Sequence, residues 1–451
     1  MAPARGGDRV KEHFLAEYRA FVGNGGGSAR APAWLKPLRA RAIARFAEVG
    51  FPTTHQEAWR FTSVQSIAET PFSLIPPDTP LPTLDDLAPL LVGGRATPRA
   101  VFVNGRFAPD LSSAQGLPDG VRLGGLAAAL AAEPALVEAH LGKYARFDAH
   151  GFTALATAFL ADGAFVSVPA KTIIEAPLQL LFVATAVAGH PMWHPRNLIV
   201  LGREARATVV ETYAGLGDAA SLTNAVTELV LGDGARGEHY RVQRESPNAY
   251  HVATTYSHQG RDSALESCAV VLGAGLSRHD LTAVLGGTGG YLILNGLQVL
   301  GGRQHVDHHT CIDHAQPHCE SHEVFNGIFD AEARGVFNGR IIVRPGAQRT
   351  DSKQTNNNLL LSRDARADSQ PQLEIYADDV KCTHGSTVGP LDPTALYYLR
   401  SRGLGAEAAR ALLTYGFGTE ILARVGVPDV RTQLDRIVRE RLHMDSWQQA
   451  T

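Results

Sequence analysis

Cysteine is scarce in this chain of 451 residues, which contains four: Cys268, Cys311, Cys319 and Cys382. No two of them are separated by only two residues, so the sequence has no C-x-x-C pair. A disulfide framework is therefore not expected, and neither is a preformed cluster held as ferredoxins hold theirs. Reduced thiols in a cytoplasmic protein fit the pattern better.

Long apolar runs and an excess of positive charge are also missing. No uninterrupted apolar run reaches about 18 residues, so we expect no transmembrane helix. The N-terminal residues MAPARGGDRVKEHF contain no apolar segment typical of a secretory signal. The formal net charge is −3, which does not favour nucleic acid or an anionic membrane as a partner.

The motifs of self-contained enzymes are missing as well. The sequence has no P-loop of the form G-x-x-x-x-G-K-[ST], no G-x-S-x-G elbow and no H-E-x-x-H pair. The glycines of Gly286–Gly290 lie between strand-like runs, with no Lys-Ser after them, and indicate a turn. We therefore expect a chain that does not hydrolyse nucleotides by itself.

Three zones differ in their hydrophobic pattern, and the first covers residues 1–163. Apolar residues recur at helical spacing over Val10–Phe21 and Trp34–Phe46, and the Ala- and Leu-rich stretch Leu123–Leu141 also predicts a helix. Between them, the pattern of Val101–Phe107 predicts a β-hairpin with its turn at Asn104-Gly105. We expect an N-terminal helical domain with one small hairpin.

The second zone, residues 164–390, consists of short β-rich runs separated by Gly-containing turns. Either a sandwich or a coiled β-solenoid suits such a pattern, and the length without a Greek-key rhythm favours the solenoid. The clearest runs are Leu178–Val183, Leu198–Leu201, Ala207–Thr212, Val226–Leu231, Ala264–Leu272, Asp280–Leu285, Tyr291–Leu300 and Gly335–Val343.

The third zone, residues 391–451, is predicted to be helical. Asp392 is placed to cap a helix that has Pro393 in its first turn, and Gly403 to end it. A second helix is expected over Ala406–Ala423 and a third from Pro428. The apolar stripe of these helices either packs on its own domain or forms a docking face for a partner.

Two stretches carry residues that bind metals. His305–His322 contains six histidines and two cysteines, but their spacing matches no standard zinc module. An alternative function follows from it: a metal-dependent β-fold oxygenase of cupin type that uses His305 and His309 with a carboxylate. The H-x-H and glutamate spacing of cupins is not reproduced.

The second stretch is Asp378–Gly385, in which Cys382 and His384 alternate and would share one face of a strand. Lys381 is expected to lower the pKa of the Cys382 thiol. Two ligands cannot complete a tetrahedral or cluster site, so a metal here would need ligands from another chain. The alternative is a buried cysteine beside a hydrogen-bonded histidine.

From Asp307 to Leu422 the chain resembles the SufB/SufD family of iron–sulfur cluster assembly proteins, and DVKCTHG is the form found in its SufD-type members. Asn326 departs from the family, where many relatives have lysine. An earlier run, His55–Val64, resembles the family's N-terminal E-x-W-R-[YF]-T element. The other matching runs are Asp313–Val343, Ala347–Ser362, Pro371–Asp392 and Tyr397–Leu404.

The resemblance implies a right-handed parallel β-helix core between helical N- and C-terminal domains. It implies a scaffold subunit in a complex with SufB and the ATPase SufC, and possible homodimers in isolation. His384 matches a histidine at the SufB interface that supplies a ligand, beside Cys382, to transient iron or a nascent cluster. The resemblance raises a reduced flavin as a possible cofactor of the complex, and the sequence does not decide whether it binds. The implied SufC-docking surface comprises Leu412, Leu413, Phe417 and Ile421.

Overall fold

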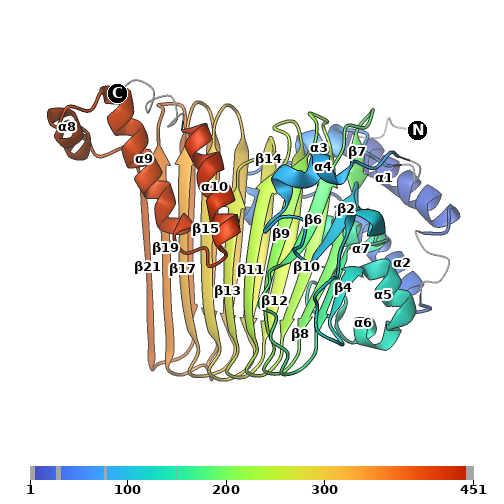
Figure 1. Ribbon diagram of the computed structural model, residues 1–451. Helices are drawn as coiled ribbons and strands as arrows, with labels where there is room; N and C mark the ends of the chain where they lie inside the picture. Colours follow the sequence, from blue (N-terminus) through green and yellow to red (C-terminus); the bar gives the residue numbers. More distant parts are fainter. Residues whose placement is uncertain (1–5, 27–31, 76–78, 149, 443–451) are drawn as a thin grey trace.

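The computed structural model describes residues 6–26, 32–75, 79–148 and 150–442. Their strands form two parallel sheets that face each other as a flattened solenoid of about eight turns (Figure 1). The chain is mainly β with helices at both ends, so the predicted parallel β-helix is confirmed.

Sheet 1 contains eleven strands and sheet 2 contains ten among the described residues. Sheet 1 consists of β1 (Ser73–Leu74), β4 (Arg122–Gly125), β5 (Ala164–Val168), β7 (Pro191–Trp193), β8 (Arg196–Leu201), β10 (Leu222–Leu231), β12 (Tyr250–Gln259), β14 (Leu276–Leu285), β16 (His305–His314), β18 (Arg334–Val343) and β20 (Arg366–Ile375). Sheet 2 consists of β2 (Arg99–Val103), β3 (Arg106–Phe107), β6 (Leu178–Ala184), β9 (Arg206–Gly215), β11 (Arg236–Arg244), β13 (Ala264–Val271), β15 (Tyr291–Leu300), β17 (Glu320–Phe329), β19 (Thr350–Leu360) and β21 (Val380–Gly389).

Helices stand at both ends of the solenoid (Figure 1). The N-terminal ones are α1 (Gly6–Gly23), α2 (Leu35–Val49), α3 (Gln65–Glu69), α4 (Leu84–Leu87), α5 (Leu126–Ala132), α6 (Pro134–His140) and α7 (Gly151–Ala158), with 3₁₀ turns η1 (Glu57–Trp59), η2 (Ala88–Leu90) and η3 (Pro109–Leu111). The C-terminal ones are α8 (Pro393–Ser401), α9 (Ala406–Leu422) and α10 (Pro428–Arg441). No described helix is long and apolar enough to cross a membrane.

Each strand of the solenoid pairs residue for residue with the strand one turn further on. Glu323 of β17, for example, is opposite Gln354 of β19, which is opposite His384 of β21. Since side chains alternate between faces, each inward position continues as a row through successive turns. An apolar cluster that includes Leu201, Leu285 and Ile341 fills much of the interior.

The two outer faces are covered by different parts of the chain. Phe14, Phe46 and Phe152 of the N-terminal helices pack in one cluster with Leu222 and Val252, which belong to sheet 1. On sheet 2, a second cluster contains residues of α9 and α10 together with Tyr240, Val270 and Leu297. The C-terminal apolar stripe therefore packs largely on its own chain.

The hairpin, the capped helix and the C-terminal helix starts are confirmed, but one helix prediction is wrong. Leu123–Leu141 is not one helix: it begins as strand β4 and continues as α5 and α6, which are separated at Glu133. Strand β4 pairs antiparallel with β5, so sheet formation overrides the local helical preference there. Pro134 lacks a backbone N–H and disfavours helical geometry in the preceding residue, which explains the break.

The segment His55–Val64 lies against sheet 1 through Trp59. The indole is 3% exposed, stacks on Phe152 at 5.6 Å and receives the guanidinium of Arg278 at 3.6 Å from its ring centre. Arg278 in turn forms ion pairs with Asp280 at 2.7 Å and Asp307 at 2.5 Å. One aromatic side chain thus joins an N-terminal segment to two turns of the solenoid.

We predict that Trp59→Ala destabilises the docking of this segment by about 3 kcal/mol, because a large buried side chain is lost and Arg278 loses its aromatic contact. Limited proteolysis followed by mass spectrometry should show faster cleavage near residues 50–70. Arg60→Ala, which removes the exposed neighbouring side chain, is the control. Equal cleavage rates in both variants would contradict the role given to Trp59.

Candidate functional site: the open end of the solenoid

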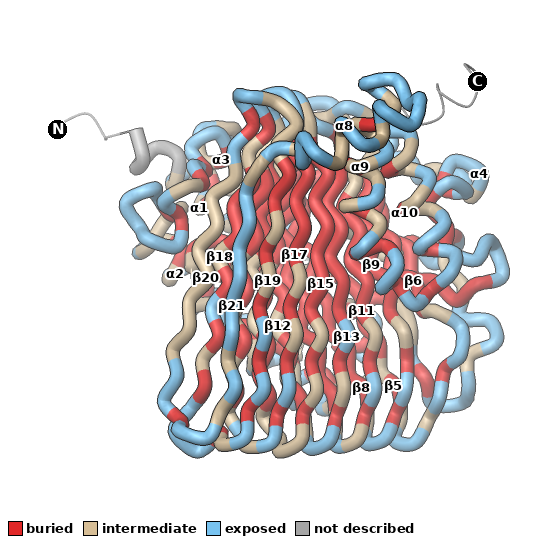
Figure 2. The backbone as a smooth tube through the Cα atoms, turned by 90° about the vertical axis from the view of Figure 1, so that its left-hand side faces the viewer, coloured by how far each residue is buried: buried red, intermediate tan, exposed pale blue. Residues whose placement is uncertain are grey.

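Cys382 and His384 lie on β21, the last strand of sheet 2. Among the described residues, β21 pairs in a ladder only with β19. Its other edge therefore presents unpaired backbone donors and acceptors, which is the arrangement that a further strand can join. Figure 2 shows β21 as a largely exposed strand beside the buried strands of the solenoid.

Cys382 points toward the interior and packs, half-buried, against its apolar cluster. Burial raises the pKa of the Cys382 thiol, and the nearby carboxylate of Asp351 raises it further. The expectation that Lys381 lowers this pKa is therefore wrong for the chain alone. Adjacent residues on a strand point to opposite faces, so Lys381 is on the other side of β21 from the thiol.

His384 is exposed, and within the described part of the chain its side chain has no hydrogen bond or ion pair. It shares the inward face with Cys382, as the alternation of a strand requires. The chain thus presents an imidazole and a thiol at the uncovered end of the solenoid. Neither the imidazole nor the thiol has a polar side-chain partner within residues 6–26, 32–75, 79–148 and 150–442.

Behind these two residues lies a polar layer that the sequence did not reveal. Ser352 and Gln354 of β19 are opposite Cys382 and His384, and Ser321 and Glu323 of β17 are one turn further in. Ser321 bonds to Ser352 at 2.7 Å, and the Gln354 amide donates to Glu323 at 2.6 Å. All four are fully buried or nearly so. The signal for them was the run of polar residues at alternate positions of β17 and β19.

The His-rich stretch does not form one site, because its histidines divide between different surroundings. His308 and His314 of β16 are buried inside the solenoid, where burial lowers their pKa values to about 3 and about 4. His318 is exposed in the following turn, and His322 bonds to Glu320. The alternation of the strand is the physical reason for the division.

His305 and His309 of β16 serve the contact with the N-terminal segment. His305 lies 2.9 Å from the Thr62 hydroxyl, and His309 lies 3.0 Å from the Asp307 carboxylate. No group of three or more His, Cys, Asp or Glu side chains in the described residues is arranged to hold a metal ion. The fold is a β-helix and not a cupin barrel, so we drop the oxygenase alternative.

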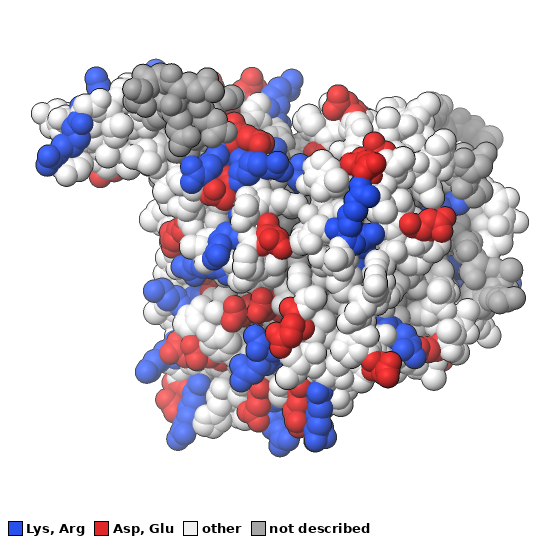
Figure 3. Space-filling view, in the orientation of Figure 1, with Lys and Arg blue, Asp and Glu red and all other residues white. Residues whose placement is uncertain are grey.

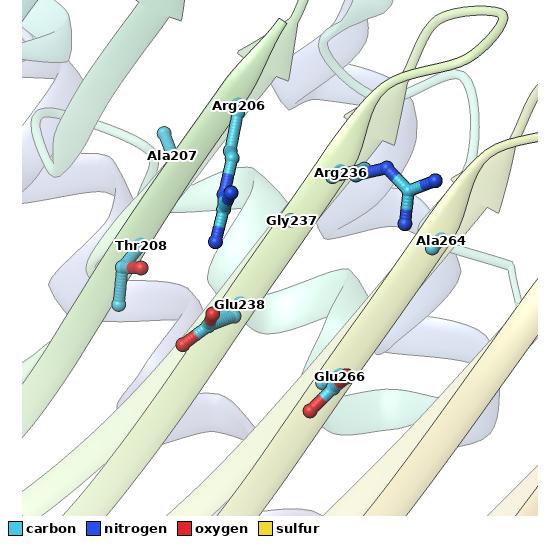
Figure 4. A pocket seen from close by; sticks show the side chains of 8 residues that line it. All are labelled: Arg206, Ala207, Thr208, Arg236, Gly237, Glu238, Ala264 and Glu266. Atoms are coloured by element: carbon cyan, nitrogen blue, oxygen red, sulfur yellow. The ribbon is translucent and has the colours of Figure 1, made fainter. Parts of the chain in front are cut away.

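A polar pocket elsewhere on sheet 2 carries no comparable chemistry. Arg206, Arg236, Glu238 and Glu266 line it from strands β9, β11 and β13, well away from β21 (Figure 4). Basic and acidic side chains are also mixed over the lower part of this face in Figure 3, with no large patch of one sign. Mixed charge does not select a particular ligand.

The residues expected to form a docking surface differ in accessibility. Leu412 is 42% exposed, while Leu413 and Phe417 are half-buried and line a pocket between α8, α9 and the end of β21. Ile421 is 0% exposed, in the cluster that joins α9 to sheet 2. Asn326 is buried beneath α9 and donates to the Phe417 carbonyl at 3.3 Å. Ile421 therefore holds the helix in place and is not part of the accessible surface.

Most of the chain is similar to known protein families. The family model described as "SUF system FeS cluster assembly, SufBD core domain" matches residues 182–417, and "SufBD protein N-terminal region" matches residues 28–180. An iron–sulfur cluster assembly SufBD family protein of Synechocystis is 35% identical over 75% of this chain and 77% of its own length.

Two relatives carry the name iron–sulfur cluster assembly protein SufD. The Escherichia coli protein is 29% identical over 90% of this chain and 93% of its own length. The Bacillus subtilis protein is 30% identical over 91% of this chain and 94% of its own length.

We predict that Glu323→Gln stabilises the protein at alkaline pH. Burial raises the pKa of Glu323 from 4.5 to about 7, although the hydrogen bond from the Gln354 amide lowers it in part. Because the native carboxyl holds its proton more tightly than the unfolded chain does, the wild type loses stability as the pH rises from about 4.5 through about 7. The loss reaches roughly 3 kcal/mol above that range.

Urea denaturation at pH 5, 7 and 8.5 measures this difference. As the pH rises, the free energy of unfolding of Glu323→Gln should increase relative to that of the wild type. That of Glu332→Gln, which changes an exposed turn residue, should stay equal to that of the wild type. If the difference in unfolding free energy between Glu323→Gln and the wild type were the same at all three pH values, the Glu323 carboxyl would titrate normally and the prediction would be wrong.

Proposed function

The chain belongs to the SufB/SufD family of iron–sulfur cluster assembly proteins, and we propose that it is a scaffold subunit whose last strand supplies half of a shared site. The observation that carries this proposal is the position of Cys382 and His384 on the unpaired edge of β21. Iron or a nascent cluster is the cargo that these residues would bind. The missing ligands would come from a second chain at the same edge.

The proposed second chain is SufB. A parallel β-helix that ends in an open edge can extend its ladder into another β-helix through backbone hydrogen bonds. Such a joint would bring SufB side chains over the uncovered layer of Cys382 and His384. It would also exclude water from the half-buried thiol and the exposed imidazole. A second copy of this chain could occupy the edge in the absence of SufB.

The proposed third component is the ATPase SufC, docked on the C-terminal helices. Helix α8 projects beyond the solenoid in Figure 1 and has no buried residue. Tyr397 and Tyr398 on it are 76% and 56% exposed, close in the sequence to the exposed Leu404 and Leu412. These four residues, together with Leu413 and Phe417, form the proposed docking surface. Large exposed apolar and aromatic side chains on neighbouring elements are typical of an interface.

The two proposed interfaces are mechanically connected. Only Pro390, Leu391 and Asp392 separate the end of β21 from α8. The pocket that contains Leu413 and Phe417 is also lined by Thr387 and Val388 of β21. We therefore propose that ATP-driven movement of SufC displaces α8 and α9, and with them the edge strand that carries His384. The joint would open for iron and persulfide sulfur, and this chain would catalyse no step itself.

We predict that His384→Ala reduces cluster maturation in a strain that depends on this chain, by roughly tenfold, because the half-site loses its nitrogen ligand. The activity of a reporter iron–sulfur enzyme measures the effect. Thr383→Ala alters the neighbouring exposed side chain on the other face of β21 and is the control. Normal maturation with His384→Ala would exclude the half-site.

We also predict that Leu412→Asp combined with Tyr397→Asp abolishes co-purification of the ATPase, since charges would replace the centre of the apolar surface. Leu216→Asp changes a similarly exposed apolar residue at the far end of β9 and should leave co-purification intact. If the double variant still retained the ATPase, the docking surface would have to lie elsewhere on the chain.

A further inference from the structure

A row of three polar side chains runs along the inward face of the last turns of sheet 2. Glu323 of β17, Gln354 of β19 and His384 of β21 are direct register partners. Paired strands are about 4.8 Å apart, so each of these side chains lies beside the next. The row starts in the closed interior at Glu323 and ends on the exposed edge at His384.

The first two members of the row are held firmly. Glu323 and Gln354 are both 0% exposed, and Nε2 of Gln354 donates to Oε2 of Glu323 at 2.6 Å. Gly339 faces them from sheet 1, and a Cβ atom at that position would lie 2.1 Å from the Gln354 nitrogen. The missing side chain at residue 339 therefore makes the room that the carboxamide occupies.

The carboxamide of Gln354 has one hydrogen-bond acceptor that the described residues leave unused. Its Oε1 atom is buried and has no hydrogen-bond partner among the described residues. Buried polar atoms without a partner are rare in native proteins, and a bound water, ion or ligand is one explanation for them. Because the nitrogen and oxygen are on separate branches of one planar group, the bond from the nitrogen to β17 leaves the oxygen free for a partner other than Glu323.

We propose that Gln354 is a positioning residue for His384: when a metal cation binds at the open end, Oε1 of Gln354 accepts the N–H of one imidazole nitrogen, and the other nitrogen binds the metal. Glu323 fixes the orientation of the carboxamide through the bond to Nε2. The proposal rests on the half-site function of His384 and adds the residue that sets its tautomer.

The physical benefit lies in preorganisation. A histidine on an edge strand otherwise samples several rotamers and both tautomers, and binding a cation must overcome that freedom. Histidine ligands in metal sites nearly always donate their second N–H to a carbonyl or carboxylate, and loss of that partner weakens metal affinity about 10–100-fold. Gln354 supplies a carbonyl oxygen of this kind from a rigid, buried strand.

The experiment measures Co²⁺ binding at His384 in the full-length chain. Diethyl pyrocarbonate modifies free imidazoles, and bound Co²⁺ protects them. Trypsin releases the peptide from Cys382 to Arg400, in which His384 is the single histidine, so mass spectrometry reads its protection alone. In Gln354→Leu, the Co²⁺ concentration for half-protection should rise about tenfold or more.

Three further variants separate positioning from stability. Ser352→Ala removes a buried polar group from the same strand, next to Cys382, and should change the melting temperature without changing protection of His384. Glu323→Gln keeps an acceptor for the Gln354 amide and should bind Co²⁺ like the wild type. Glu323→Ala releases the carboxamide and should weaken protection.

The experiments distinguish a failure of the positioning role of Gln354 from a failure of the half-site function of His384. Equal half-protection in the wild type and Gln354→Leu would overturn the positioning role, while the half-site would stand on the maturation assay of His384→Ala. Parallel weakening in Gln354→Leu and Ser352→Ala would assign the effect to the fold and also overturn it. Absence of any Co²⁺ protection at His384 in the wild type would overturn the positioning role, while the half-site, whose remaining ligands come from a second chain, would again be decided by the maturation assay.

Discussion

The register of the parallel ladder is the constraint on which the rest of this structure depends. Every strand of the solenoid pairs residue for residue with its successor, so an inward position in one turn is inward in the next. A register shift of one residue would exchange the inward and outward side chains of a whole strand. The same ladder of backbone hydrogen bonds therefore aligns Gln354 and His384 with the buried Glu323. The ladder ends at β21, which pairs with no further strand among the described residues.

The helical parts cover the solenoid unevenly, and this decides where it is open. Polar contacts anchor the N-terminal region: Glu228 forms a buried ion pair with Arg196 at 2.8 Å and also accepts hydrogen bonds from the backbone N–H groups of Gly142, Tyr144 and Ala145. Removing one partner of such a pair leaves a buried charge and is strongly destabilising. The C-terminal helices cover part of the outer face of sheet 2 and reach the end of β21. No described strand pairs with the far edge of β21, so the inward layer of the last turn stays accessible from that end.

The polar layer near that end continues a series of buried polar groups inside the solenoid, which includes Glu211, His239 and His251. Hydrogen bonds that span strands, such as Ser321 to Ser352 and Gln354 to Glu323, lower the cost of burying these groups. They also hold the layer beneath Cys382 and His384 in one arrangement. Apolar residues at these places would fill the same space but would give an incoming cation no ordered support.

The sequence by itself determined the β-rich core, the hairpin at Asn104-Gly105, the C-terminal helix boundaries and the pairing of Cys382 with His384 on one strand face, because turn residues, caps and alternation are local properties. Only the tertiary structure decided that Leu123–Leu141 divides into strand and helices, that the His-rich stretch separates, and that Ile421 is buried. It alone placed Glu323 and Gln354 behind His384. Those outcomes depend on which strands become neighbours about 30 residues apart, and local pattern contains no information about that pairing.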